Sequence, residues 1–166
     1  IVRLFTLSGK DDLEFLGLGV IISPEGVVVA DSRIVDKKEN YVAMLSDGTR
    51  VNAEPSDTQT EQGFFKLELP AELPLLVPAT FASFDKLVLG QTVVALTGET
   101  STRIAPGIIA ELSPSTGSES SRLRATIDTG TIVLGSPLID LSGAIIGMPE
   151  NQESQIFLSL RESAGE

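Results

Sequence analysis

The sequence predicts an all-β protein built from two six-stranded antiparallel β-barrels. Three observations support this. Short apolar runs recur along the whole chain, turn residues (Gly, Pro, Asp, Asn or Ser) separate them, and no stretch keeps a helical period. With 42% apolar but only 5% aromatic residues, the core must consist mainly of Val, Ile and Leu. These residues favour strands over aromatic-rich surfaces.

The expected strands fall into two groups of six. Those in the first half are 1–6, 15–22, 26–30, 41–45, 50–54 and 63–69. Those in the second half are 91–97, 103–111, 122–127, 135–140, 143–148 and 155–160. Each is a short run bounded by turn residues, which is the signature of a β-rich domain.

The two groups are separated by residues 70–86. Three prolines in this segment, Pro70, Pro74 and Pro78, prevent regular strand pairing and predict an extended linker. The sequence therefore predicts a first barrel over 1–69, a linker over 70–86 and a second barrel over 87–166.

Charge and composition exclude several classes of function. A formal net charge of −11 without basic clusters argues against nucleic acid and anionic membranes as partners. The chain has no cysteine, so it offers no thiolate, no disulfide and no Cys-based metal site. No apolar run is long enough for a membrane helix, so membrane contact is expected only through a segment absent from this chain.

The chain also contains no histidine. It therefore cannot run a Ser-His-Asp mechanism, use an imidazole base or bind zinc through nitrogen. No glycine-rich phosphate loop is present either, because the glycines lie at turns. We expect no metal and no cofactor.

The segment 126–147, T-I-D-T-G-T-I-V-L-G-S-P-L-I-D-L-S-G-A-I-I-G, reads as a turn and a β-hairpin. It resembles the nucleophile segment of HtrA-type trypsin-like serine proteases, T-D-A-x-x-x-x-G-N-S-G-G-P-L followed by a hairpin that ends in V-I-G-I. The match is anchored on Pro137-Leu138 and closed by Ile145-Ile146-Gly147. It places Leu134 where that family carries its nucleophilic serine.

Further segments resemble the same family in the correct order. Residues 17–26, G-L-G-V-I-I-S-P-E-G, are similar to its G-S-G-V-I-I-S-P-D-G hairpin. Residues 29–35, V-A-D-S-R-I-V, are similar to V-T-N-x-H-V-V, and 56–61, S-D-T-Q-T-E, to T-D-P-x-T-D. The resemblance extends from about residue 15 to about residue 148, and it implies a single trypsin-like domain over 1–166.

The resemblance implies a lost catalytic triad. Arg33 stands at the position of the family's histidine, Glu61 at that of its aspartate and Leu134 at that of its serine. An arginine cannot accept a proton, and a leucine has no nucleophilic atom. We expect Arg33 and Glu61 to face one another as an ion pair.

The resemblance also implies an altered oxyanion loop at Ile132, Val133 and Gly135. Ile132 and Val133 replace the family's Gly-Asn, and their β-branched side chains restrict the backbone conformations available to a donor loop. The neighbouring Ser136 lacks an evident base and is interpreted as a turn residue.

From these residues we expect a catalytically inactive pseudoprotease that is not an enzyme. The leading function is binding of an extended peptide or protein segment, because strand addition does not need the triad. The alternative is a structural or assembly module. A third, weaker possibility is an enzyme that uses the carboxylates Asp128, Asp140 and Glu150.

Family analogy alone suggests an extracytoplasmic location, in the periplasm or cell envelope. The ligand's identity and the oligomeric state are left open.

Overall fold

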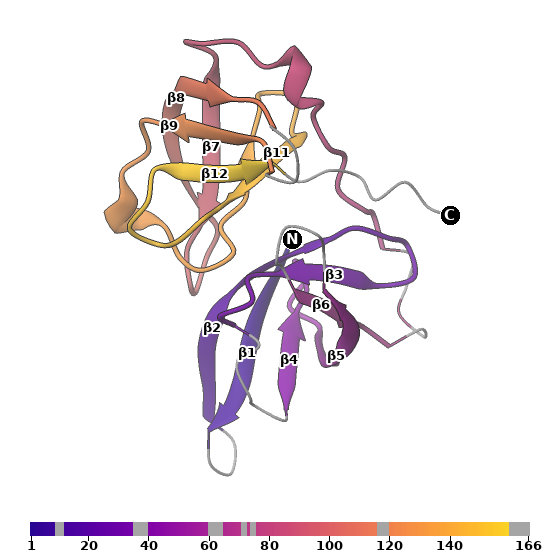
Figure 1. The fold of residues 1–166 in the computed structure, drawn as a ribbon. Helices are drawn as coiled ribbons and strands as arrows, with labels where there is room; N and C mark the ends of the chain where they lie inside the picture. The colour runs from indigo at the N-terminus through magenta and orange to yellow at the C-terminus, as the bar shows by residue number, and fades with distance from the viewer. Residues whose placement is uncertain are drawn as a thin grey trace. The chain divides into compact units, whose positions relative to one another are not determined.

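The computed structural model describes residues 1–8, 12–34, 40–59, 65–70, 73, 76–115 and 120–159. The chain divides into two compact units, Ile1–Ala79 and Thr80–Glu166. Each unit contains one barrel, and each is described by itself. Figure 1 shows the strands of both barrels.

The first barrel is a closed antiparallel sheet with the strand order β1-β2-β3-β6-β5-β4. Its strands are β1 (Val2–Ser8), β2 (Asp12–Ile21), β3 (Val27–Ala30), β4 (Tyr41–Met44), β5 (Arg50–Gln59) and β6 (Phe65–Glu68). The alternation of the side chains turns one face of each strand toward the interior. Val2, Leu4, Val28 and Leu67 fill it and are almost fully buried.

The second barrel is also closed, with the order β10-β11-β12-β9-β8-β7. Its strands are β7 (Thr92–Thr97), β8 (Arg103–Ser113), β9 (Arg122–Ala125), β10 (Leu138–Ile139), β11 (Ile145–Pro149) and β12 (Ile156–Ser159). Two short 3₁₀ turns accompany them, η1 (Phe84–Lys86) and η2 (Thr129–Thr131).

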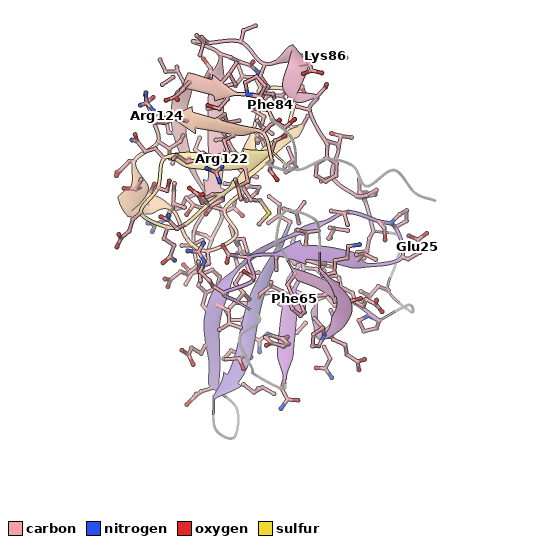
Figure 2. The ribbon with its side chains drawn as sticks, viewed as in Figure 1. Glu25, Phe65, Phe84, Lys86, Arg122 and Arg124 are labelled. Carbon is pink, nitrogen blue, oxygen red and sulfur yellow. The ribbon has the colours of Figure 1, made fainter. Side chains whose placement is uncertain are left out.

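The core of the second barrel is mainly aliphatic, and among its described residues one aromatic ring is fully buried. Phe157 is fully buried in it, with Ile109, Leu123, Leu138 and Ile146 in the same cluster. Charged residues stay outside. Arg122 and Arg124 project from β9, where Arg122 pairs with Glu150 and Arg124 pairs with Glu111 (Figure 2).

The predicted fold class is confirmed, since the structure is all-β with two closed six-stranded antiparallel barrels. Each of the twelve strands overlaps the range expected from the sequence. The boundary between the two units, after Ala79, falls inside the segment expected as a linker. Among the described residues, no helix has the length and apolar character needed to span a bilayer.

Several strands differ from the expected bounds, and for two of them the hydrogen bonds give the reason. β10 begins at Leu138 rather than at 135, because residues 133–136 form a hydrogen-bonded turn. β2 begins at Asp12 rather than at 15, because it pairs with β1 as far as Ser8. The first hairpin is therefore longer than the apolar pattern alone indicates.

Candidate functional site

The loop between η2 and β10 contains the position that the resemblance assigns to a nucleophile. The Asp128 carboxylate accepts a hydrogen bond from the Gly130 N–H at 3.1 Å and so caps η2. Ile132 follows, with its side chain buried in the core of the second barrel. Leu138 anchors the other end of the loop in the same core. The loop is thus held at both ends by apolar packing.

A tight turn lies between these anchors. The Ser136 N–H donates to the Val133 carbonyl at 3.1 Å, and the Val133 N–H donates to Ser136 Oγ at 3.0 Å. Gly135 has φ +73°, the left-handed region that a type II turn requires at its third residue. Leu134 occupies the second position of the turn and is half-buried. The turn therefore presents an apolar side chain where a reacting hydroxyl is expected from the resemblance.

The backbone donors expected in the oxyanion loop are engaged within the loop. The Ile132 N–H donates to the Thr129 carbonyl at 3.2 Å, and the Val133 N–H is held by Ser136 Oγ. The first bond is the i→i+3 bond that closes the 3₁₀ turn η2, and the second is a side-chain bond within the following turn. Both N–H groups are occupied in this conformation.

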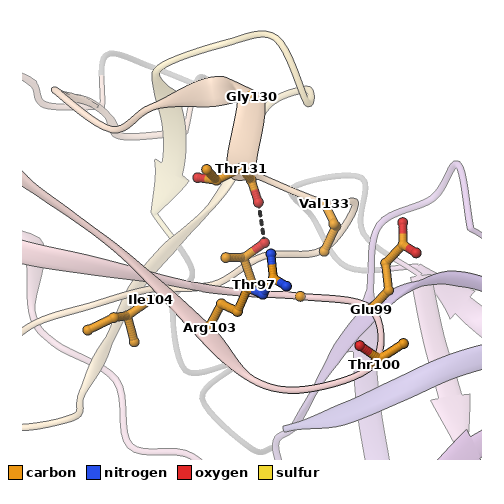
Figure 3. Close-up of a pocket in the computed structure, with 9 residues that line it drawn as sticks. Thr97, Glu99, Thr100, Arg103, Ile104, Gly130, Thr131 and Val133 are labelled. Carbon is orange, nitrogen blue, oxygen red and sulfur yellow. Dashed lines mark hydrogen bonds between the residues drawn. The ribbon is translucent and has the colours of Figure 1, made fainter.

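A hollow of about 320 Å³ opens beside this loop within the second unit. Figure 3 shows its walls, which come from the β7–β8 connection with the adjoining strand ends and from η2 together with Val133. The lining residues are Thr97, Gly98, Glu99, Thr100, Arg103, Ile104, Gly130, Thr131 and Val133. The Thr97 hydroxyl donates to the Thr131 carbonyl and ties the two walls together. The hollow combines hydroxyl groups, one carboxylate, one guanidinium and two aliphatic side chains.

Sequence reasoning missed this hollow. Thr97 and Arg103 were assigned only to strands, since their spacing forms no recognised motif. The β7–β8 connection and η2 are about thirty residues apart in the chain, as the separation of 34 between Thr97 and Thr131 shows. Only the folded barrel brings them together.

Arg33 lies in the first unit and forms a forked ion pair with Asp31. Its Nε donates to Asp31 Oδ1 at 2.8 Å and its Nη2 donates to Asp31 Oδ2 at 2.5 Å. The Arg33 N–H also donates to Asp31 Oδ1. The side-chain hydrogen bond to Asp31 raises the pKa of Arg33, although partial burial acts in the opposite direction. Arg33 is thus a fixed cation in this conformation.

The expected ion pair between Arg33 and Glu61 stays a prediction, because Glu61 lies outside the described residues. The pair with Asp31 was not anticipated. The two residues are separated by a single position, so a local fork was available from the sequence.

The three acidic residues considered for a carboxylate site each have local partners. Asp128 caps η2. Glu150 pairs with Arg122 at 3.6 Å. Burial acts to raise the pKa of Asp140, but hydrogen bonds from Ser142 and the Ala144 N–H outweigh it and hold that pKa below its ordinary value. In the described part of the chain, no group of three or more His, Cys, Asp or Glu side chains is arranged to hold a metal ion.

Replacing Ser136 with alanine is expected to loosen the loop. Ser136 is fully buried, and its hydroxyl accepts the Val133 N–H. Loss of that acceptor leaves a partly buried donor without a partner, at a cost of about 1–3 kcal/mol in unfolding free energy. Urea titration measures the change, and faster hydrogen exchange of the Val133 amide localises it. Ser101→Ala, at an exposed position, is the matched control, and an equally small effect of both substitutions would contradict the expectation.

Comparison with known proteins gives a consistent result. Residues 17–148 match the model of the trypsin-like peptidase domain. A probable periplasmic serine protease do/HhoA-like of Haemophilus influenzae is 31% identical over 151 residues, which cover 84% of this chain and 31% of that protein. Serine protease HTRA1A of Danio rerio is 27% identical over 144 residues, covering 80% of this chain and 29% of that protein. The chain thus spans about a third of the length of these relatives.

Solved structures agree on the fold. The HtrA-type protease AlgW with decapeptide superposes with a TM-score of 0.78 at 16% identity, over 95% of this chain and 60% of that one. Deg5 gives a TM-score of 0.77 at 17% identity, over 95% of this chain and 82% of that one. The HtrA-like double barrel expected from the sequence is therefore supported by sequence and by structure.

The prediction that this chain is not an enzyme is wrong by this comparison. The relatives are named serine proteases or endoproteases, and they indicate a protease. That prediction used only the side chains at the presumed triad positions. The similarity to the named proteases extends over most of the chain. The assignment of Arg33, Glu61 and Leu134 to those positions, and of Ile132, Val133 and Gly135 to the oxyanion loop, stays a prediction.

Proposed function

The chain belongs to the family of trypsin-like peptidase domains, and from that premise we propose that its second barrel binds an extended polypeptide segment. The binding surface is the Val133–Ser136 turn together with the hollow beside it. The observation that carries the proposal is this juxtaposition of a rigid apolar turn with a hollow of about 320 Å³. A shallow recess next to a fixed apolar contact suits one side chain of an extended chain.

The chemistry of the recess supports a peptide over other ligands. Its walls carry the hydroxyls of Thr97 and Thr100, the charges of Glu99 and Arg103, and the aliphatic Val133. Such a mixture matches the alternating polar and apolar groups of a polypeptide. The net charge of −11 disfavours nucleic acid as the ligand. Among similar structures, that of the HtrA-type protease AlgW is described as containing a decapeptide.

The turn is suited to binding because its conformation is already fixed before a ligand binds. Its two hydrogen bonds and the buried Ser136 fix Leu134 before any ligand arrives. A contact that is already ordered avoids the entropy of immobilising a loop, which otherwise reduces affinity. Leu134 then contributes apolar area without reorganisation.

Leu134→Arg is expected to weaken peptide binding at least about tenfold, since it replaces an apolar contact with a charge that must be desolvated. The test screens a random library of extended peptides against the wild type and then measures the affinities of the selected binders. Leu141→Arg is the matched control, because it adds the same charge at an exposed turn position in the same barrel. We expect the control to retain affinity within about twofold.

An assembly function is the second candidate, and one observation favours it. The outer face of β7, β8 and β10 is apolar, with exposed Ile104 and Ile108 and half-buried Leu96. The pairing of Leu96 with Ile104 places both on this face. Contiguous exposed apolar area is typical of interaction surfaces. An absence of binders, or binders indifferent to Leu134→Arg, would put this function ahead.

We also propose that the domain works outside the cytoplasm. The relatives from Haemophilus influenzae and Brucella suis are named probable periplasmic proteases. Cell fractionation followed by immunoblotting tests this location, and recovery in the cytoplasmic fraction alone would refute it.

A further inference from the structure

β2 extends well beyond β3, the strand that pairs with it on one side. It pairs with β1 along the whole hairpin, from Ser8 opposite Asp12 to Val2 opposite Gly19. It pairs with β3 only from Gly19 to Ile21. Among the residues that the structure describes, no strand pairs with the other side of β2 between Asp12 and Leu18. In Figure 1 this part of β2 borders the first barrel on the left.

The register shows which backbone groups lie at this edge. Hydrogen-bonded residues alternate along an antiparallel strand, and the Ile22 N–H donates to Val27 at 2.8 Å on the β3 side. The bulge leaves Leu16 without a partner in β1 and shifts the alternation by one residue. On the N-terminal side of the bulge, Leu13 and Phe15 therefore direct their backbone N–H and C=O groups away from β1.

The side chains along the edge alternate in character. Phe15 lies opposite Phe5, with their ring centroids 5.6 Å apart and the rings edge-to-face, and Leu13 lies opposite Leu7. Residues directly opposite share a face, so these four side chains form one apolar surface. Asp12 and Glu14 are on the other face, and both are exposed. The edge thus carries acidic side chains on one face and apolar side chains on the other.

This alternation decides which kind of strand fits. A second copy of the same edge would bring acidic side chains toward acidic side chains in a chain that already carries a net charge of −11. Charged residues on an edge strand are a common device against such self-pairing. A strand of alternating basic and apolar residues instead places its cations against Asp12 and Glu14 and its apolar side chains against Leu13 and Phe15.

We propose that the β2 edge, from Asp12 to Leu18, is a second polypeptide-binding surface that accepts a basic-apolar alternating segment of another protein by strand addition. The surface lies in the first barrel and uses none of the residues proposed to bind peptide in the second barrel. Main-chain hydrogen bonds to Leu13 and Phe15 would supply the affinity, and the two faces would supply the selectivity.

The test uses the whole chain and a dye-labelled octapeptide of alternating lysine and valine. Fluorescence anisotropy is expected to show binding that falls about tenfold for a peptide of the same composition with all lysines before all valines, because the alternation is lost. Hydrogen exchange of the wild-type protein is expected to show slowing at the Leu13 and Phe15 amides on binding of the alternating peptide.

A pair of double variants isolates the edge charges. D12K/E14K is expected to weaken binding of the alternating peptide about tenfold, since two opposite-charge pairs become like-charge pairs. E54K/E68K changes the net charge equally at two exposed positions of β5 and β6 and is expected to act within about twofold. Lack of binding, equal binding of the two peptides, equal losses in both variants or unchanged exchange at Leu13 and Phe15 would each overturn the proposal.

Discussion

Phe157→Ala is expected to cost about 3–5 kcal/mol of unfolding free energy, the largest effect of any side-chain truncation in the second barrel. Phe157 is fully buried and is the one aromatic ring in the central cluster of that barrel, as far as the described residues go. Its removal loses apolar burial and leaves a cavity that the paired strands cannot close, because hydrogen bonds hold β12 between β9 and β11. Urea titration followed by far-UV circular dichroism measures the loss.

Phe157→Leu and Phe84→Ala serve as controls for this result. The leucine variant keeps much of the volume and is expected to cost clearly less than the alanine variant. Phe84 only packs against the edge of the same cluster and remains partly exposed, so its truncation is also expected to cost less. If Phe157→Ala changed the unfolding free energy by less than about 1 kcal/mol, the assignment of this ring to the packed core would be refuted.

Gly147→Ala is expected to destabilise the protein by about 3 kcal/mol or more, although it adds only one methyl group. A Cβ at this position would lie 2.4 Å from the Leu158 carbonyl oxygen and 3.0 Å from its carbon. Both are backbone atoms of the paired strand β12, so relief requires the ladder between Gly147 and Ser159 to shift. The same unfolding measurement reports the effect.

Gly130→Ala is the matched control for the clash. A Cβ there would meet only Asp128 Oδ1, at an ordinary 3.4 Å. Its expected cost is under about 1 kcal/mol. Equal costs at the two glycines would contradict the expectation that the close approach of β12 limits the residue at position 147.

The fold was largely predictable because it depends on short-range signals. Alternating apolar residues and turn residues mark each of the twelve strands. Gly147 also gains a physical reason: it closes the motif that anchored the resemblance, and a Cβ there would collide with the Leu158 carbonyl of the paired strand β12. Gly147, which the sequence identified only as part of a family motif, is therefore required by the packing of β11 against β12.

The site was less predictable because its contacts join distant parts of the chain. The hollow depends on Thr97 and Thr131, which only tertiary structure brings together. The length of the first hairpin was underestimated at Asp12 and Leu13, although their acidic-apolar alternation continues into Glu14 and Phe15. The fork between Arg33 and Asp31, two positions apart, was also not predicted, although both residues are polar neighbours in the sequence. The predicted pair between Arg33 and Glu61 stays a prediction, because Glu61 lies outside the described residues.

The closed 3₁₀ turn at Thr129–Thr131 limits the affinity of any ligand that must accept a hydrogen bond from this loop. The Ile132 N–H is committed to Thr129, so a ligand that needs this donor binds only the fraction of molecules in which the bond is open. Its apparent dissociation constant rises in inverse proportion to that fraction. A loop closed in about 99% of molecules would weaken such a ligand about a hundredfold, whereas a ligand that contacts only Leu134 would be unaffected. The opening equilibrium of the loop therefore lowers the affinity of peptides that bind through their backbone carbonyls. It leaves the affinity of peptides that bind only through side chains unchanged.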